Sequence, residues 1–308
     1  MRASRRHFLA SAGAATLATP LPAPAAESTR PLRVAFFTDL HTRVEWGTPE
    51  ALGRAADAIN AASPDLAICG GDCITDGFTA AATALAPRWD AYLENLHRRL
   101  RMPVEVAIGN HDLTGVRPTD GSAPDPDPRA EFLRRLGLER TWRHADHHGV
   151  RFVFLDALEI LPAGEPYRGW VSDEQLEWLD GLLSASPADQ PFVVVSHMPL
   201  LSVFQQAVKG ALEPLAPGRA VGNNLEVLRR FEGRRLLAVL QGHLHVNELI
   251  QWRGVTFITG GAVSGKWWRG AWQGTEEGFG LVTIDPASGR VDWEYRDLFW
   301  AARRPEGQ

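Results

Sequence analysis

The order of apolar and amphipathic segments constrains the fold of this chain more than any other feature of its sequence. Short apolar runs, typical of buried strands, occupy residues 32–37, 65–69, 104–108, 151–155 and 192–195. Longer segments with apolar residues at helical spacing occupy residues 49–62, 78–100 and 172–183. This alternation predicts parallel strands covered by helices, and therefore an α/β fold.

Local signals add detail to this prediction. Ser172, followed three residues later by Gln175, predicts a capping box at the start of the third helix. From Leu236 onward the chain consists of short apolar runs joined by turns, which predicts a second, largely antiparallel sheet. We find no internal repeat and no linker, so residues 27–300 are expected to form a single domain.

Composition limits the classes of partner. The chain has 308 residues, a hydrophobic content of 44% and a formal net charge of −5. A chain of this length can bury a substantial core. Its acidic balance gives no basic field that would gather nucleic acid, so a nucleic-acid partner is not expected.

The N-terminal segment predicts export. Residues 4–10 read "SRRHFLA", and a modestly apolar stretch and several prolines follow. This pattern favours a signal peptide over residues 1–26 rather than a stable membrane span, and it resembles a twin-arginine signal. We therefore expect the twin-arginine export machinery as a partner and a periplasmic or secreted location. Residues 301–308 are expected to form a disordered tail.

Five of the predicted strands run directly into polar side chains. The blocks read "TDLH", "GGD", "GNHD", "SHMP" and "GHLH" in chain order. They supply Asp39, His41, Asp72, Asn110, His111, Asp112, His197, His243 and His245. Because ligands bind at the carboxyl ends of strands in α/β sheets, we expect these side chains to converge.

The residue types in these blocks indicate a metal centre. Imidazole and carboxylate ligands together suit Zn, Fe or Mn, whereas Mg and Ca prefer oxygen alone. Seven candidate ligands are too many for one tetrahedral ion, and a carboxylate such as Asp72 can bridge two ions. Two ions roughly 3.5 to 4 Å apart clamp the attacking and the leaving oxygen of an in-line displacement at phosphorus. Gly242 would let the chain turn at the end of its strand.

In order and content, the five blocks resemble the pattern of the calcineurin-like metallophosphoesterase family, over about residues 32–284. The resemblance implies a four-layer α/β/β/α sandwich of two mixed β-sheets flanked by helices. It also implies two divalent or trivalent ions of Fe, Mn or Zn. One ion would be held by Asp39, His41 and His245, the other by Asn110, His197 and His243, with Asp72 bridging.

The same resemblance implies a reaction. A metal-bridging hydroxide would attack a small phosphate ester in line with the departing alkoxide. His111 would act as general acid or stabilise developing charge, and Asp112 would orient its ring. Phosphodiesters are the favoured substrates. A phosphomonoesterase using the same site and a non-catalytic scaffold protein are the alternatives.

Two stretches leave alternatives open. Residues 260–272 read "GGAVSGKWWRGAW" and resemble a stretch of some bacterial family members. Either their tryptophans pack the second sheet, or Lys266, Trp267, Trp268 and Arg269 border the substrate pocket. Cys69 and Cys73 could form a disulfide, contribute to a metal site or serve as small buried hydrophobes, and we favour the last.

One departure from a related branch is informative. Purple acid phosphatases have a tyrosine three residues after the bridging aspartate, and Thr75 stands at that place here. The iron-tyrosinate chemistry of that branch is therefore not expected.

Overall fold

The computed structural model describes residues 30–303. The predicted signal peptide and residues 304–308 of the predicted tail lie outside this range. Residues 301–303 have no regular secondary structure, and Arg303 pairs with Glu50 at the start of the first helix. No helix within the described range is long and apolar enough to cross a membrane.

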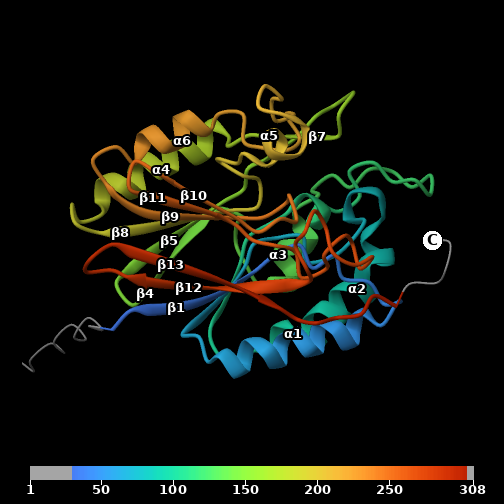
Figure 1. Ribbon diagram of the computed structural model, residues 1–308. Helices are drawn as coiled ribbons and strands as arrows, with labels where there is room; N and C mark the ends of the chain where they lie inside the picture. The colour runs from blue at the N-terminus through green and yellow to red at the C-terminus, as the bar shows by residue number, and fades with distance from the viewer. Residues whose placement is uncertain (1–29, 304–308) are drawn as a thin grey trace, which may run out of the picture.

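Two sheets pack face to face, and helices cover their outer faces (Figure 1). The first sheet has the order β13-β12-β1-β2-β3. Its strands are β1 (Leu32–Phe37), β2 (Leu66–Cys69), β3 (Val104–Val106), β12 (Gly278–Asp285) and β13 (Arg290–Asp297). The second sheet has the order β10-β11-β9-β8-β5-β4. Its strands are β4 (Arg143–His147), β5 (Val150–Leu155), β8 (Pro191–Ser196), β9 (Arg235–Gln241), β10 (Glu248–Trp252) and β11 (Val255–Thr259).

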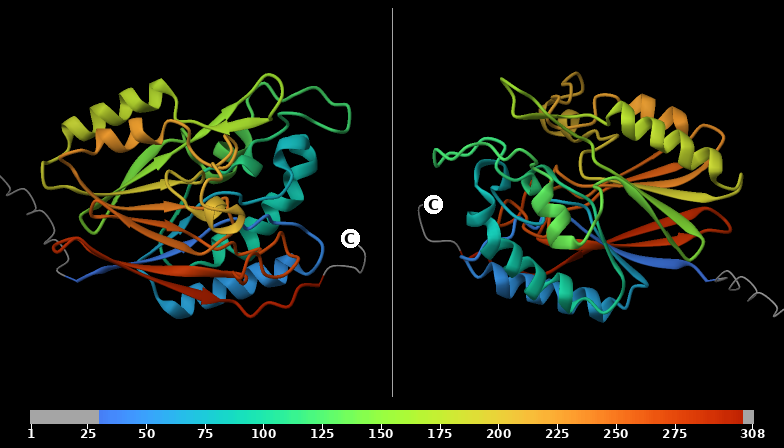
Figure 2. Two further views of the ribbon diagram at one scale, coloured as in Figure 1. Left: turned by 45° about the horizontal axis from the view of Figure 1, so that its top comes forward. Right: turned by 180° about the vertical axis from the view of Figure 1, so that it is seen from behind.

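The outer layers are helical, as Figure 2 shows from two further sides. Helices α1 (Thr48–Ala62) and α2 (Ala82–Asn95) cover the first sheet, and α4 (Asp173–Ala185) and α6 (Asn224–Arg230) cover the second. Shorter elements complete the chain: α3 (Ala130–Leu136), α5 (Phe204–Lys209) and the small hairpin of β6 (Leu158–Ile160) and β7 (Tyr167–Gly169). The predicted four-layer α/β/β/α sandwich is confirmed.

The core explains why the strands are apolar on both faces. Alternate residues of β1 point in opposite directions. Val34 and Phe36 pack between the two sheets, whereas Ala35 and Phe37 join the core beneath the helices. Each buried strand thus bridges two apolar layers, which is why it appears in the sequence as a continuous apolar run.

The chain from Leu236 onward does not form the separate antiparallel sheet that we expected. Strands β9, β10 and β11 join the second sheet, where β9 pairs in parallel with both β8 and β11. Strands β12 and β13 instead extend the first sheet, with β12 antiparallel to β1. Local apolar patterns predict that strands exist, but their pairing depends on contacts far apart in the sequence.

Two helix predictions also need correction. The expected helix over 78–100 is α2 flanked by 3₁₀ turns at Gly77–Thr79 and His97–Arg99, because Leu96 leaves the helical conformation. At α4, the Ser172 hydroxyl does accept the N–H of Gln175. The Gln175 side chain, however, binds the backbone of Asp156, so the cap is present without the reciprocal half of a capping box.

Candidate metal centre

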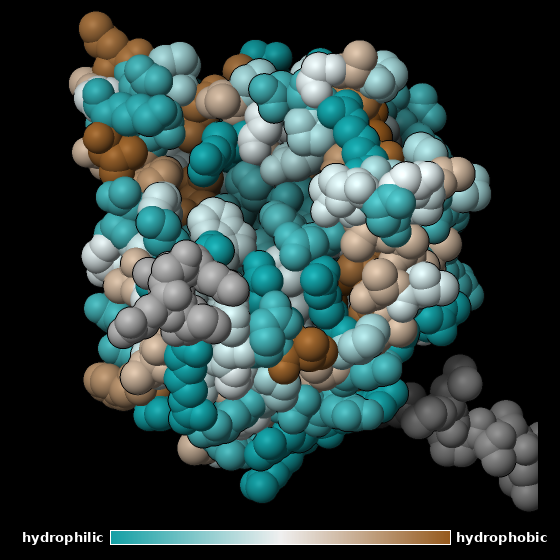
Figure 3. Space-filling view, turned by 90° about the vertical axis from the view of Figure 1, so that its right-hand side faces the viewer, coloured by the Kyte–Doolittle hydropathy of each residue, from teal (hydrophilic) through white to brown (hydrophobic). Residues whose placement is uncertain are grey.

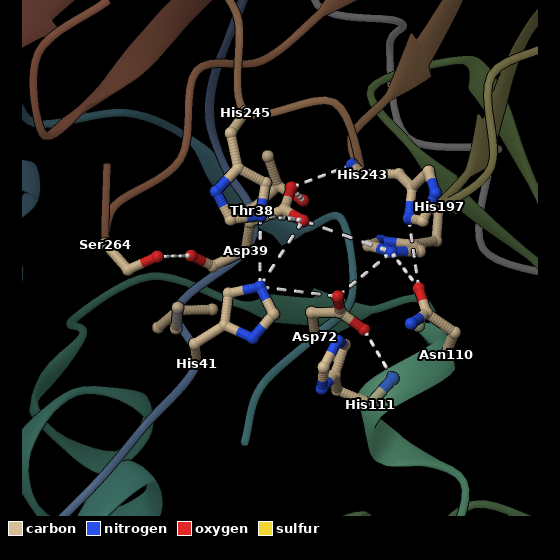
Figure 4. Close-up of polar contacts among 12 residues, drawn as sticks. Thr38, Asp39, His41, Asp72, Asn110, His111, His197, His243, His245 and Ser264 are labelled. Atoms are coloured by element: carbon tan, nitrogen blue, oxygen red, sulfur yellow. Dashed lines mark hydrogen bonds and ion pairs between the residues drawn. The ribbon is translucent and has the colours of Figure 1, made fainter. Parts of the chain in front are cut away.

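The carboxyl ends of the parallel strands meet at one edge of the sandwich and bring all seven predicted ligands together (Figure 4). Two groups of side chains match the predicted ion sites. Ligand atoms of Asp39, His41 and His245 all lie within 4.8 Å of one another, and so do those of Asp72, His197 and His243. Asn110 joins the second group, because its Oδ1 lies 3.0 Å from His243 Nδ1 and 3.1 Å from His197 Nε2.

The backbone of these strand ends is held in an unusual conformation. Five of the seven residues, namely Asp39, His41, Asp72, His243 and His245, have φ between 43° and 70°. This left-handed region is uncommon for residues other than glycine and is concentrated at functional sites. The loop after β1 is held there by the loop after β2, since the Asp39 and His41 N–H groups donate to Gly71 and Asp72.

Gly242 serves a different purpose from the one that we predicted. The left-handed turns fall on His243 and His245, and Gly242 itself is not among the positive-φ residues. A Cβ at position 242 would lie 2.3 Å from Thr38 Oγ1 and 2.7 Å from Asp39 Oδ2. Glycine is therefore needed so that the two ligand-bearing loops can approach each other.

Each carboxylate uses one oxygen to fix its position and aims the other into the cluster. Asp39 Oδ2 accepts hydrogen bonds from the Thr38 hydroxyl and the His243 N–H. Its Oδ1 is buried, has no hydrogen-bond partner among the described residues, and lies 3.2 Å from His245 Nε2. Asp72 Oδ1 accepts the N–H of His111, and its Oδ2 lies 3.5 Å from His41 Nε2 and 3.2 Å from His197 Nε2. Asp72 thus lies between the two groups, where a bridging ligand is expected.

Three of the four imidazole rings in the ligand set are oriented by backbone carbonyls. His197 Nδ1 donates to Gly70, His243 Nε2 to Gly218 and His245 Nδ1 to Gly265. These bonds leave His197 Nε2, His243 Nδ1 and His245 Nε2 facing the cluster. Such partners on the outer ring nitrogen are typical of histidines that bind metals.

Nitrogen and oxygen atoms of the predicted ligands converge in the cluster at short distances. His41 Nε2 lies 3.0 Å from His245 Nε2, and Asn110 Oδ1 faces the unprotonated nitrogen of His243. The ligand set fits two metal cations, because cations at these two places would satisfy the converging acceptors.

The negative charges of the buried carboxylates also favour cations in the site. Burial opposes a positive charge on His197, but Asp72 and Asp39 beside it raise its pKa to about 10. Two buried carboxylates therefore stabilise positive charge at this place. Burial and the neighbouring His197 lower the pKa of His243 to about 3, so that this ring is neutral, as a metal ligand must be.

His111 lies beside the cluster, but the predicted role of Asp112 is wrong. Asp112 Oδ1 accepts the N–H groups of Cys73 and Ile74, and Oδ2 accepts that of Gly109. Its carboxylate therefore ties together the loops after β2 and β3, and its hydrogen bonds go to these amides rather than to the His111 ring. The N–H of Asp76 instead donates to His111 Nδ1, over 3.3 Å.

The tryptophan stretch combines both of the interpretations that the sequence left open. Trp267 lines the cavity over the cluster, with its ring centroid 4.5 Å from that of His245. Trp268 is only 1% exposed, and its Nε1 donates to the carbonyls of Leu40 and His41. The pocket prediction is wrong for Trp268, because its side chain is enclosed behind the loop after β1 that carries Asp39 and His41, called the ligand loop below.

The two basic residues of this stretch also lie outside the lining of the metal cavity. Lys266 Nζ lies 5.1 Å from the Trp272 ring centroid, and the Arg269 guanidinium lies 5.6 Å from that of Trp46. Their predicted place in the substrate pocket needs correction, because both side chains pack on tryptophan rings instead.

Comparison with known proteins gives these observations a family. A sequence model of the calcineurin-like phosphoesterases matches residues 32–247, a range that includes all seven ligands. The chain belongs to this family. It is a metal-dependent phosphoester hydrolase, and its Asp and His side chains are positioned to bind two metal ions.

Two relatives have similar sequences. The chain is 25% identical to glycerophosphodiester phosphodiesterase GpdQ of Enterobacter lignolyticus over 241 residues, which are 73% of this chain and 75% of that protein. It is 28% identical to a probable cyclic nucleotide phosphodiesterase of Rhodococcus erythropolis over 199 residues. That match covers 63% of this chain and only 56% of the relative.

Solved structures agree on the fold. A dimetal phosphatase from Danio rerio has a TM-score of 0.61 at 16% identity, over 87% of this chain and 97% of that one. A purple acid phosphatase from yellow lupin seeds has a TM-score of 0.56 at 16% identity, over 89% of this chain and 53% of that one. At such low identity these likenesses concern the fold alone.

The cavity of this phosphoesterase includes residues that the sequence did not single out. Seen from the end where the parallel strands finish, a hydrophilic hollow lies near the middle of the surface (Figure 3). Alongside the cluster and Trp267, the metal cavity of about 150 Å³ is lined by Tyr167, Gly218 and Arg219. They follow no metal motif, and only the general tendency of loops to carry function could have drawn attention to them.

The two cysteines of this phosphoesterase are free thiols. Cys69 ends β2, and both side chains are buried with their Sγ atoms 3.7 Å apart. Neither belongs to a group of potential metal ligands in the described part of the chain. This placement agrees with the favoured interpretation, in which both serve as small buried hydrophobes.

Proposed function

We propose that this protein hydrolyses phosphodiesters at a centre of two transition-metal ions, Fe, Mn or Zn. The observation that carries the proposal is the arrangement of the seven ligands in two groups with the Asp72 carboxylate between them. Bound ions would polarise the phosphoryl oxygens and lower the pKa of a water molecule. Asp39, His41 and His245 would hold one ion, and Asn110, His197 and His243 the other.

His111 would act on the substrate rather than on the ions. Its Nδ1 accepts the N–H of Asp76, so the ring carries its proton on Nε2. A ring nitrogen of His111 lies within 4.8 Å of ligand atoms of His41 and Asp72, and the ring lines the cavity. A neutral imidazole with this tautomer is a hydrogen-bond donor, which favours stabilisation of charge on the leaving oxygen over transfer of a proton from an imidazolium.

The preference for diesters over monoesters rests on the relatives. Both are phosphodiesterases by name, one for glycerophosphodiesters and one, as a probable assignment, for cyclic nucleotides. Monoesters and diesters can use the same pair of ions, so the metal centre alone favours neither.

The proposal is tested by side-by-side kinetics. The protein is stripped with chelator, reloaded with Mn²⁺, Zn²⁺ or Fe²⁺, and assayed on bis-p-nitrophenyl phosphate and p-nitrophenyl phosphate. We expect two ions per chain and a higher kcat/KM for the diester. A higher kcat/KM for the monoester would make the protein a phosphomonoesterase, and a metal-loaded protein inert on both would support the scaffold alternative.

A further inference from the structure

A second cavity of about 240 Å³ adjoins the metal cavity. The two cavities share Tyr167, Gly218 and Arg219 as lining residues. The second cavity is completed by Glu165, Pro166, Ala216 and Pro217. At the roughly 30 Å³ that one water molecule occupies in the liquid, it has room for about eight non-hydrogen atoms.

The walls of this cavity are built into the fold. The N–H of Gly169, at the end of β7, donates to Pro217, and the N–H of Gly222 donates back to Gly169. A Cβ at Gly169 would lie 2.2 Å from the carbonyl oxygen of Ala220, so the strand and the loop are in close contact. The same loop presents the Gly218 carbonyl that orients His243, which links the cavity wall to a metal ligand.

The position of the second cavity distinguishes the two ester groups of a diester. Tyr167 lies on the His243 side of the cluster, with ring centroids 6.4 Å apart. His111 lies on the other side, next to His41, with ring centroids 4.6 Å apart. If His111 serves the leaving oxygen, the cavity beside His243 receives the group that stays on phosphorus.

The lining residues suggest what that group and its phosphate present. Tyr167 and two prolines offer apolar faces to a ring. Arg219 lines both cavities, and within residues 30–303 its only hydrogen bond is that of its backbone N–H to Ala216, so its guanidinium is unpaired there. A free guanidinium beside a phosphoryl site can bind an anionic phosphate oxygen.

We propose that the second cavity is a subsite for the retained ester group of a phosphodiester, preferring a single ring to a small alkyl group, with Arg219 binding the phosphate at its entrance. This inference rests on the proposed function, because a monoester has no retained group to place there.

The subsite is tested with three substrates that share the p-nitrophenolate leaving group: phenyl p-nitrophenyl phosphate, methyl p-nitrophenyl phosphate and p-nitrophenyl phosphate. Ala216 lines only the second cavity and is exposed, so Ala216→Trp should fill the subsite without unfolding the protein. Leu212→Trp is the matched control, because Leu212 lies on the same loop, is 97% exposed and lines neither cavity.

We expect the wild type to prefer the phenyl to the methyl diester. Ala216→Trp should lower kcat/KM roughly tenfold or more for the phenyl diester and leave the other two substrates unchanged. Leu212→Trp should behave like the wild type. An equal effect of Ala216→Trp on all three substrates, or no effect, would overturn the subsite.

The role of Arg219 in binding the phosphate is tested by removing its charge. Arg219→Gln should raise KM, and the inhibition constant of inorganic phosphate, roughly tenfold with kcat nearly unchanged. Arg253→Gln removes the same charge from an exposed turn outside both cavities and should change neither constant. Unchanged constants in Arg219→Gln would remove Arg219 from the subsite. A wild type inactive on all three substrates would instead count against the proposed function itself.

Discussion

The metal centre and the wall of the second cavity beside it are built in opposite ways. The ligands follow the ends of parallel strands, and apart from the half-buried His243 they are at most 4% exposed. Five of the seven ligands are held by a second bond to backbone or hydroxyl groups. The wall comes from the small β6–β7 hairpin and a loop whose Ala216 and Arg219 are exposed. The comparison teaches that the reacting groups are fixed by the core, whereas substrate selection is assigned to surface segments that can vary without disturbing it.

The largest effect should come from the centre, at the carboxylate between the two groups. Asp72→Asn removes a negative charge that both ion sites would share. We expect kcat to fall by about 10³-fold or more, together with loss of bound ions, because the ions contribute several kcal/mol to catalysis. Metal analysis and kinetics measure both effects. Asp146→Asn, an exposed carboxylate on β4, is the control, and an Asp72→Asn protein with two ions and near-normal turnover would contradict the assignment.

The second-largest effect should come from His111. Its substitution separates the effect on catalysis from the effect on metal binding. His111→Ala should lower kcat by roughly 10²-fold or more, the contribution of a hydrogen-bond donor aimed at developing charge. Bound metal should remain nearly unchanged. His144→Ala, on an exposed position of β4, should leave both quantities as in the wild type. Loss of both ions from His111→Ala would show that His111 is a ligand.

The third-largest effect should come from Trp268, because it acts on the metal centre through the ligand loop. Trp268→Phe keeps most of the ring but removes the N–H that binds the carbonyls of Leu40 and His41. We expect metal affinity to fall about 10- to 100-fold, as for other groups that orient ligands. Titration of activity with Mn²⁺ after chelation measures this affinity.

The control for Trp268 is a tryptophan of equal burial. Trp89 is also fully buried, and its Nε1 has no hydrogen-bond partner among residues 30–303. Trp89→Phe therefore makes a similar change in volume without losing a hydrogen bond, and its metal affinity should be unchanged. Equal losses in the two variants would mean that packing alone supports the loop.

The smallest effect should come from Lys266, which lies outside both the centre and the wall. Because its ammonium group packs over Trp272, Lys266→Gln should change KM for phosphate esters by less than about twofold. The comparison with Arg219→Gln is informative, since both changes remove one positive charge. A tenfold rise in KM for Lys266→Gln would return this residue to the substrate pocket.

The ligand set could be predicted from the sequence because it depends on local pattern and one topological rule. Each ligand lies within four residues of the end of its strand, as Asp39 and His41 do after β1. Apolar runs locate the strands, and parallel strands end at the same edge of a sheet. The residue types alone then indicate metal chemistry, before any distance is known.

Other features depended on contacts that no local pattern encodes. Asp112 resembles a partner for His111 in sequence, but amides from the loop after β2 occupy its carboxylate. Trp267 and Trp268 are neighbours with the same side chain, yet one lines the cavity and the other is enclosed behind the ligand loop.

The sequence by itself therefore indicated an α/β fold, the candidate metal ligands and the family, because strands and motifs are local. Only the tertiary structure decided what surrounds the ions. Tyr167 and Arg219 are 52 positions apart, and hydrogen bonds between β7 and the loop after Pro217 bring them to the same cavity. Such pairings follow from the packing of the whole chain, and neither side chain is marked by spacing or composition.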